Sequence, residues 1–307
     1  MIKKKKLRKN VFVISLLFIV PLIFLINVKA YTIQLKNKVD PIIPYLTIKI
    51  SNKNNKSENK EKSLNNTSKY ENKISIIELQ KKLINKKLSI LGDSISTYEG
   101  YSNDYINSNS TTGNNIVFYY DSLFLNNVNA TWWMQAINRT KLKLLVNNSS
   151  AGDAVTWKAP TRAKQLHNNI KGHEEKPDII AVYIGINDIK DGISLNDFKI
   201  KYQEMVNNIR LSYEDAEIFL FTHIPYTCYN VARSIISPEE LELFNNVIRD
   251  IANNVKKCNI VDLYSDSEIK IDNYKTYMGD QGLHPNALGM DKITEAFVNA
   301  LIKKYVY

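Results

Sequence analysis

The chain is poor in the residues that most often hold metal ions. Its 307 residues include two cysteines and four histidines. None of these six residues forms the closely spaced set that a metal site requires, so we expect no metal. Cys228 and Cys258 follow or open neighbouring predicted strands. Because the compartment inferred below is oxidising, a disulfide between them is one alternative and two free thiols are the other.

A basic excess is missing from the part of the chain that has a globular pattern. The formal net charge is +10, but residues 1–10 carry +6 and residues 11–87 carry +9, which leaves −5 for residues 88–307. A nucleic-acid-binding domain needs basic surface to neutralise phosphates. The distribution therefore argues against a nucleic-acid partner. The positive charge of residues 1–87 is instead typical of a segment that orients a chain in a membrane, followed by a solvated linker.

The first residues have the pattern of an export segment. Residues 1–10 are basic, and residues 11–28 form a largely apolar run of 18 residues, close to the length that crosses a bilayer as a helix. The cations predict a cytoplasmic N-terminus, with the rest of the chain outside. Two fates stay open: a single-pass anchor in the cell membrane, or a signal peptide cleaved near Ala30, which gives a secreted protein.

Residues 29–73 are expected to form an extracytoplasmic stalk. Between residues 51 and 72 the composition is dominated by Asn, Lys, Ser and Glu, and Leu64 is the only aliphatic residue. Such a segment buries too little apolar surface to fold alone. The pattern becomes globular from residue 74, and residues 74–307 are long enough for one domain with a full core.

Short apolar runs without alternation indicate buried strands in this domain. The runs lie at residues 88–91, 142–146, 179–184, 218–221 and 260–263, and stretches with helical spacing lie at 198–211, 239–255 and 287–304. This order predicts an α/β fold with a parallel sheet covered on both faces. Ligands of such sheets bind at the carboxyl ends of the strands.

Four short segments supply the groups that a serine esterase needs, in this order: Gly92–Ser96 (GDSIS), Asn148–Asp153 (NSSAGD), Gly185–Asp188 (GIND) and Asp280–Asn286 (DQGLHPN). Ser94 follows a buried strand and a glycine that permits a tight turn, so its hydroxyl is the candidate nucleophile. A serine needs a base to take its proton. His284 is the leading base, because the Pro-Asn that follows it starts a helix and fixes its loop.

The same segments offer donors for an oxyanion. Gly152 has a backbone N–H with no side chain in the way, Asn187 has a side-chain amide, and the backbone N–H of Ser94 completes the set. Taken singly, each segment is as typical of a plain turn or a helix cap as it is of a catalytic site. The hypothesis therefore depends on all four occurring together.

Together the segments resemble the four blocks of the SGNH, or GDSL-type, esterase and acylhydrolase family over about residues 88–307. Four further segments resemble a bacterial branch of it: Ser96-Thr97, Glu99-Gly100, Tyr119-Tyr120 and Thr131–Trp133. The resemblance implies a three-layer α/β/α sandwich, flavodoxin-like, around a roughly five-stranded parallel sheet. It also implies a Ser–His–Asp hydrolase without a metal or other cofactor.

One position departs from the family pattern. The family has an aspartate three residues before the histidine, where this chain has Gln281, and Asp280 lies four residues before. We expect Asp280 to orient His284. The alternatives are a Ser94–His284 dyad whose ring is oriented by a backbone carbonyl, and Asp272 as a weaker substitute.

Five aromatic residues near the motifs are candidates for a substrate-binding wall: Tyr98, Tyr119, Tyr120, Trp132 and Trp133. The alternative places them in the core, which is the commoner position for aromatic residues next to a predicted helix. An exported enzyme on a polar tether suits acyl or acetyl esters of extracellular or envelope glycans, and small esters fit almost as well. The expected partners are thus an ester substrate and a membrane.

The sequence predicts a carboxylic-ester hydrolase that acts through an acyl-enzyme. Two alternatives stay open. An envelope O-acyltransferase would pass the same acyl group to a sugar hydroxyl instead of water. A non-catalytic glycan-binding module would keep the fold, and in it His284 would lie out of reach of Ser94.

Overall fold

The structure is a computed structural model, and it describes residues 73–102, 117–170, 173–225, 236–280 and 282–307. The basic segment, the apolar segment and nearly all of the stalk lie outside these residues. So does Cys228, and with it the alternative of a disulfide to Cys258. In the described ranges, no helix is both long and apolar enough to cross a membrane.

Five parallel strands form the central sheet in the order β2-β1-β5-β6-β7. They are β1 (Lys87–Gly92), β2 (Lys143–Ser149), β5 (Ile179–Tyr183), β6 (Glu217–Phe221) and β7 (Cys258–Val261). The predicted strands and their parallel arrangement are confirmed. The chain passes from β1 to β2 and then crosses to β5 on the other side of β1. The order therefore reverses between β1 and β5, where open α/β sheets bind ligands.

The register brings three strand ends level with one another. Gly92, the last residue of β1, pairs with Ser149 of β2 on one side and with Tyr183 of β5 on the other. The segments that carry Ser94, Gly152 and Asn187 therefore leave the sheet at one edge. This is the edge that the sequence motifs predicted.

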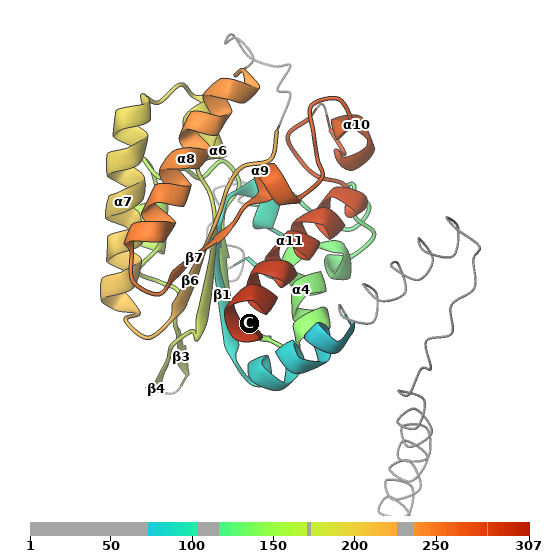
Figure 1. Cartoon of the computed structure of the whole chain (residues 1–307), viewed down its shortest axis with the longest axis vertical. Helices are drawn as coiled ribbons and strands as arrows, with labels where there is room; N and C mark the ends of the chain where they lie inside the picture. The colour runs from blue at the N-terminus through green and yellow to red at the C-terminus, as the bar shows by residue number, and fades with distance from the viewer. Residues whose placement is uncertain (1–72, 103–116, 171–172, 226–235, 281) are drawn as a thin grey trace, which may run out of the picture. The chain divides into compact units, whose positions relative to one another are not determined.

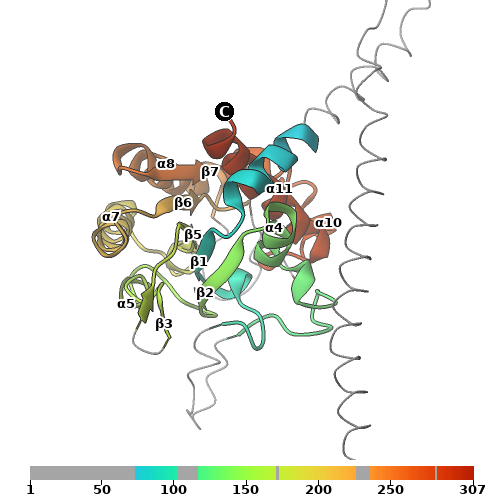
Figure 2. The same ribbon diagram turned by 90° about the horizontal axis from the view of Figure 1, so that it is seen from below.

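Helices cover both faces of the sheet (Figures 1 and 2). On one face lie α7 (Leu195–Ser212) and α8 (Pro238–Asn254), and on the other α4 (Trp132–Thr140), α11 (Ala287–Tyr305) and the helix of residues 73–83. Ser194, Ser237 and Asn286 cap the starts of α7, α8 and α11 with their side-chain oxygens, as expected for N-cap residues. The three-layer α/β/α sandwich is confirmed.

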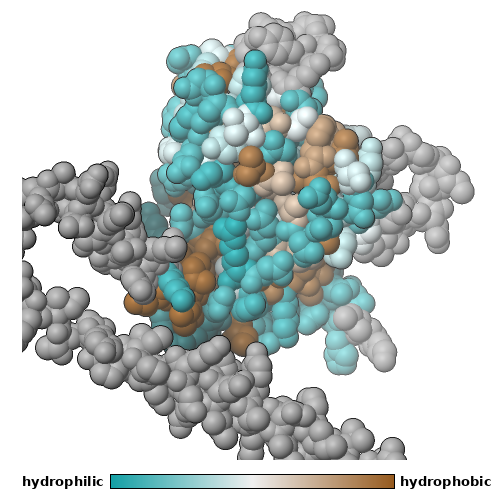
Figure 3. Space-filling view, turned by 90° about the vertical axis from the view of Figure 1, so that its right-hand side faces the viewer, coloured by the Kyte–Doolittle hydropathy of each residue, from teal (hydrophilic) through white to brown (hydrophobic). Residues whose placement is uncertain are grey.

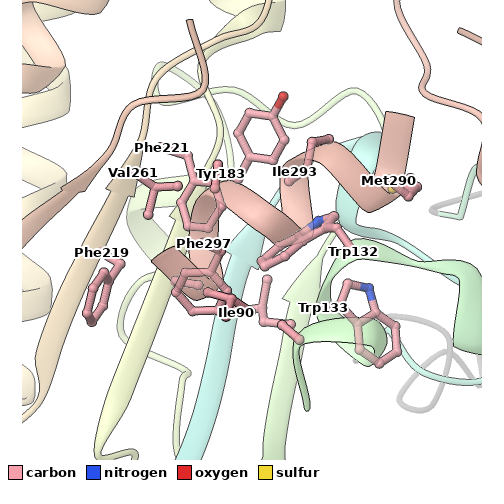
Figure 4. Packing of buried hydrophobic residues seen from close by; sticks show 14 of the residues in the cluster. Ile90, Trp132, Trp133, Tyr183, Phe219, Phe221, Val261, Met290, Ile293 and Phe297 are labelled. Carbon is pink, nitrogen blue, oxygen red and sulfur yellow. The ribbon is translucent and has the colours of Figure 1, made fainter. Parts of the chain in front are cut away.

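Alternate residues of each strand enter different halves of the core. In β1, Ile90 packs toward α4 and α11, whereas Leu91 packs toward α7 and α8. Aromatic rings dominate the first half (Figure 4): the ring centroids of Trp132 lie 5.1 Å from Phe221 and 5.8 Å from Phe297. Both faces of the three inner strands, β1, β5 and β6, are almost wholly buried, which explains the absence of polar alternation in their sequences.

Short elements complete the fold. They are η2 (Ser94–Ser96), η3 (Val128–Ala130), α5 (Ala159–Arg162), the antiparallel pair β3 (Asn168–Ile170) and β4 (His173–Glu175), α6 (Ile186–Lys190), α9 (Leu263–Asp266) and α10 (Tyr274–Tyr277). They are too short to leave a periodic pattern, and the sequence did not predict them. The side of the molecule shown in Figure 3 is mainly hydrophilic, with separate apolar patches.

Candidate active site

Ser94 begins the tight turn η2 directly after β1. The carboxylate of Asp93 caps this turn by accepting the N–H of Ile95 at 3.0 Å. Gly92 is required before it, because a Cβ at this position would lie 2.6 Å from Cβ of Ser96. The turn therefore folds back closely on the end of β1 and holds Ser94 at the edge of the sheet.

Ser96 anchors the turn from beneath. The indole N–H of Trp132 donates to its hydroxyl and that of Trp133 to its carbonyl, both at 3.1 Å. The side-chain amide of Asn147, on β2, donates to the same carbonyl at 2.9 Å. Each of these donors is buried. Because a buried donor that lost its acceptor would cost free energy, these hydrogen bonds favour this one conformation of the turn. The two tryptophans therefore support the Ser94 turn.

His284 joins Ser94 to Asp280. Its Nε2 lies 2.9 Å from Oγ of Ser94, and its Nδ1 lies 2.5 Å from Oδ2 of Asp280. A carboxylate can only accept hydrogen bonds, so Nδ1 carries the proton. Nε2 is then free to accept the hydrogen of the serine hydroxyl. This is the arrangement of a nucleophile, a general base and an acid that orients the base.

The carboxylate of Asp280 is held by its own loop. Oδ1 accepts the backbone N–H groups of Gly282, Leu283 and His284 at 3.0, 2.9 and 3.0 Å. Burial alone would raise the pKa of Asp280. The hydrogen bonds from the His284 ring and these N–H groups outweigh burial and hold the pKa well below its usual range. Asp280 is therefore an anion at neutral pH.

The aspartate reaches the ring in spite of its shifted position. Gly282 has φ +127°, a backbone conformation open mainly to glycine, and the loop curls around Oδ1 of Asp280. Gln281, at the position where the family has its aspartate, lies outside the described residues. Asp272 is exposed, and the structure, which describes it, records no contact between it and His284. Of the three arrangements expected for the ring, the geometry has the one with Asp280.

Two further donors stand at the same edge of the sheet. Asn187 lies in α6, after β5, and its Nδ2 donates one hydrogen to the carbonyl of Asp153 at 2.8 Å. The second amide hydrogen stays available. Gly152 has φ +76°, and nothing lies within 4 Å of where its Cβ would be. Within the described ranges, the N–H groups of Ser94 and Gly152 donate to no protein acceptor.

The loop that carries Gly152 is fixed by two buried carboxylates. Asp188 accepts the N–H of Val155 at 2.7 Å and both the N–H and the hydroxyl of Thr156, at 3.0 and 2.6 Å. Asp153 accepts the N–H groups of Ala154 and Lys158, and burial raises the pKa of Asp153 to about 6. The donors of a preorganised oxyanion site need this kind of rigid support.

The structure distinguishes between the two alternatives for the five aromatic candidates, a substrate-binding wall and core packing. Trp132, Trp133, Tyr119 and Tyr98 are at most 4% exposed and belong to the half of the core that also includes residues of α4 and α11. Only Tyr120, at 48% exposed, presents its ring to solvent. The alternative of core packing therefore holds for four of the five candidates.

Two aromatic residues that the sequence did not single out lie on segments that carry parts of the site. Phe118 stacks on the imidazole of His284, with ring centroids 3.5 Å apart and planes 12° apart. Trp157 is 59% exposed and follows Thr156, which is bonded to Asp188 beside Asn187. Both lie in irregular segments, so no periodic signal marks them, although Phe118 directly precedes the Tyr119-Tyr120 pair.

The comparisons with known proteins agree with this geometry. Residues 90–292 match the family described as the GDSL-like lipase/acylhydrolase family. No curated protein matches the chain in sequence. A structure described as a GDSL-like lipase, from Bacteroides ovatus ATCC 8483, is similar in fold at 24% identity and a TM-score of 0.51, over 71% of this chain and 99% of that one.

A second solved structure, described as a platelet activating factor from Streptococcus pneumonia, is 16% identical. It has a TM-score of 0.50 over 80% of this chain and all of the other. At these identities the two likenesses establish the fold. The family match spans most of the domain and includes Ser94, Gly152, Asn187 and His284. The chain therefore belongs to the GDSL-like lipase/acylhydrolase family, whose members are hydrolases that act on esters.

Proposed function

We propose that this chain is a serine carboxylic-ester hydrolase in which Ser94 is the nucleophile, His284 the general base and Asp280 the orienting acid. The continuous set of contacts from Ser94 Oγ to His284 Nε2 and from His284 Nδ1 to Asp280 carries the proposal. A glycan-binding module without catalysis would not need a polarised serine. The 2.9 Å contact between His284 and Ser94 therefore supports an enzyme.

Acylation begins when Oγ of Ser94 attacks the carbonyl carbon of the ester and its proton passes to Nε2 of His284. The charge on the carbonyl oxygen is met by the N–H groups of Ser94 and Gly152 and by the amide of Asn187. The ester C–O bond then breaks, and the alcohol leaves with the proton from His284. Each oxyanion donor of this kind is typically worth about 3–4 kcal/mol in the transition state.

Deacylation repeats the steps with water as the nucleophile. His284 takes a proton from the water as it attacks the acyl-enzyme, and returns it to Oγ of Ser94 as the acid is released. Throughout the cycle Asp280 stays ionised and stabilises the imidazolium. The low pKa of Asp280 supports this role, because a protonated acid would not hold His284 in the same tautomer.

For the substrate we propose acyl or acetyl esters of extracellular or cell-envelope glycans. Two exposed rings support this class. Trp157 lies on the loop that carries Gly152, and Tyr120 lies two residues after Phe118, which covers His284. Exposed aromatic rings on the segments that carry a reactive centre suit ligands with both apolar and polar faces, as sugars have. The proposed location, anchored in the membrane or secreted, follows from residues 1–28 of the sequence.

The test is the fate of the acyl group. The full chain is incubated with O-acetylated oligosaccharides and, separately, with p-nitrophenyl esters of increasing chain length, and free acid and acylated sugar are both quantified. We expect free acetate from the oligosaccharides, and none with Ser94→Ala. Acetyl groups that appear on an added acceptor sugar instead of in water would indicate the O-acyltransferase. A preference for long acyl chains over acetylated sugars would contradict the glycan substrate.

A further inference from the structure

Phe118 covers one face of the His284 imidazole. The two ring centroids are 3.5 Å apart and the planes are within 12° of parallel, so the contact is a full face-to-face stack. His284 is 8% exposed. The edge of the Tyr119 ring approaches the same imidazole, at 6.2 Å and 81°. The histidine is therefore held by an aromatic pocket as well as by Asp280.

The segment that carries Phe118 is tied to the Ser94 turn. The backbone N–H of Phe118 donates to the hydroxyl of Thr97 at 2.8 Å, and that hydroxyl donates to the carbonyl of Ser94, also at 2.8 Å. One threonine side chain thus links the backbone of Ser94 to the backbone of Phe118. Thr97 is fully buried, so water does not compete for these bonds.

The same segment is also tied to the histidine loop. The hydroxyl of Tyr119 donates to the carbonyl of Pro285 at 2.8 Å, in a buried position. Phe118 and Tyr119 therefore bridge the two turns that carry Ser94 and His284, which lie 190 residues apart in the sequence. Asp280 contacts the ring through Nδ1, and Phe118 covers one face of it.

We propose that Phe118 is a positioning residue for the reaction, one that holds the plane of the His284 ring toward Ser94 and stabilises the imidazolium formed in each half-reaction. The inference rests on the proposed Ser94–His284 function. An aromatic face attracts a cation placed over it, and the attraction grows when water is excluded. Orientation contributes as well, because small misplacements of a reacting group cost large factors in rate.

The test compares four variants with the full-length wild type: Phe118→Leu, Phe118→Tyr, Phe124→Leu and Ser94→Ala. Leucine keeps the apolar volume at position 118 but removes the ring. We expect Phe118→Leu to lower kcat about 10- to 100-fold, with KM changed less than about 2-fold. Tyrosine keeps the aromatic face, and kcat should stay within about 3-fold of wild type.

Phe124 is the matched control. Its ring packs against Gly279, in the loop that carries His284, and lies 6.2 Å from the Phe118 ring, yet the structure records no contact between it and the imidazole. Phe124→Leu therefore tests loosening of the loop without loss of the stack. We expect kcat within about 3-fold of wild type, although the melting temperature falls.

Proton NMR and circular dichroism together distinguish loss of the His284 ring position from loss of the fold. The Nδ1 proton that His284 shares with Asp280 should give a far-downfield proton NMR signal in wild type, Phe118→Tyr and Phe124→Leu. The signal should broaden or disappear in Phe118→Leu, because the ring is no longer held in plane. Circular dichroism should show the same fold in all variants.

Four outcomes are decisive. If Phe118→Leu retains wild-type kcat, or if Phe124→Leu loses as much, the positioning role is wrong while the esterase function stands. The role is equally wrong if the downfield signal is unchanged in Phe118→Leu. If wild-type activity is no greater than that of Ser94→Ala, the proposed function fails and takes this inference with it.

Discussion

Asp280 contacts the imidazole of His284 at 2.5 Å although it lies four residues before the histidine. The carboxylate does so by accepting three consecutive backbone N–H groups on Oδ1, which leaves Oδ2 for the ring. One side chain thus shapes the loop and orients the base. The spacing that departs from the family pattern still delivers an anion to Nδ1.

The first prediction concerns this carboxylate. Asp280→Asn should lower kcat/KM by about 10²- to 10⁴-fold, because an amide neither stabilises the imidazolium nor enforces the correct tautomer. Asp272→Asn, a matched change at an exposed position of the same region, should leave kcat/KM unchanged. Steady-state hydrolysis of p-nitrophenyl acetate measures both. An Asp280→Asn enzyme within 3-fold of wild type would favour the Ser94–His284 dyad.

The second prediction concerns the oxyanion donors. Asn187→Ala should lower kcat by about 10²- to 10³-fold and change KM little, because its amide hydrogen is needed only when charge develops on the carbonyl oxygen. Asn196→Ala, at an exposed position on α7, is the control. Saturation kinetics on one ester separates the two constants. A change confined to KM would show that Asn187 binds the ground state instead.

The third prediction concerns pH and stability. Burial raises the pKa of Asp93 to about 7, against about 3.9 in an unfolded chain. Between these two pH values Asp93 is protonated in the folded state but ionised in the unfolded state. Its contribution to the free energy of unfolding is therefore fully present below about pH 4 and is lost as the pH rises through 7. The wild type should lose about 2–4 kcal/mol of unfolding free energy between pH 4.5 and 7.5 from this group.

Asp93→Asn removes the titrating group and keeps an oxygen that can cap the Ile95 N–H. Its unfolding free energy, measured with urea at a series of pH values, should decline less steeply over that range. Asp153 and Asp188, whose pKa values burial also raises, leave a residual slope of the same sign. Parallel curves for wild type and variant would contradict the assignment to Asp93.

The fourth prediction concerns the substrate. Trp157→Ala should raise KM for an O-acetylated oligosaccharide by about 5- to 30-fold, since stacking on an aromatic face is worth about 1–2 kcal/mol. The same variant should leave p-nitrophenyl acetate hydrolysis unchanged. Trp157→Phe keeps a ring and should lose much less. Equal losses on both substrates would assign Trp157 to the stability of the Gly152 loop.

Much of the fold and the chemistry could be predicted from local pattern. Leu88–Leu91 and Ile179–Ile184 read as buried strands because both of their faces are covered by helices. Ser94 could be predicted because a buried strand and a glycine precede it, and His284 because Pro-Asn follows it. Both signals lie within a few consecutive residues.

What escaped prediction depends on contacts between distant segments. The sequence left open whether Trp132 and Trp133 face a substrate or pack in the core, and the structure has them buried and hydrogen-bonded to Ser96. An aromatic side chain has the same local signature in a wall and in a core, and only packing decides between them. Phe118 went unnoticed for the same reason, because its partner lies more than 160 residues away.

Hydrolysis of p-nitrophenyl acetate by the full chain, beside Ser94→Ala and His284→Asn, is the sharpest test of the acyl-enzyme mechanism. We expect a burst of p-nitrophenol equal to one acyl group per wild-type chain, with the acetyl group found on Ser94 by mass spectrometry. Each variant should lose at least about 10³-fold in rate. Turnover that persists in Ser94→Ala, or an acetyl group on another residue, would contradict it.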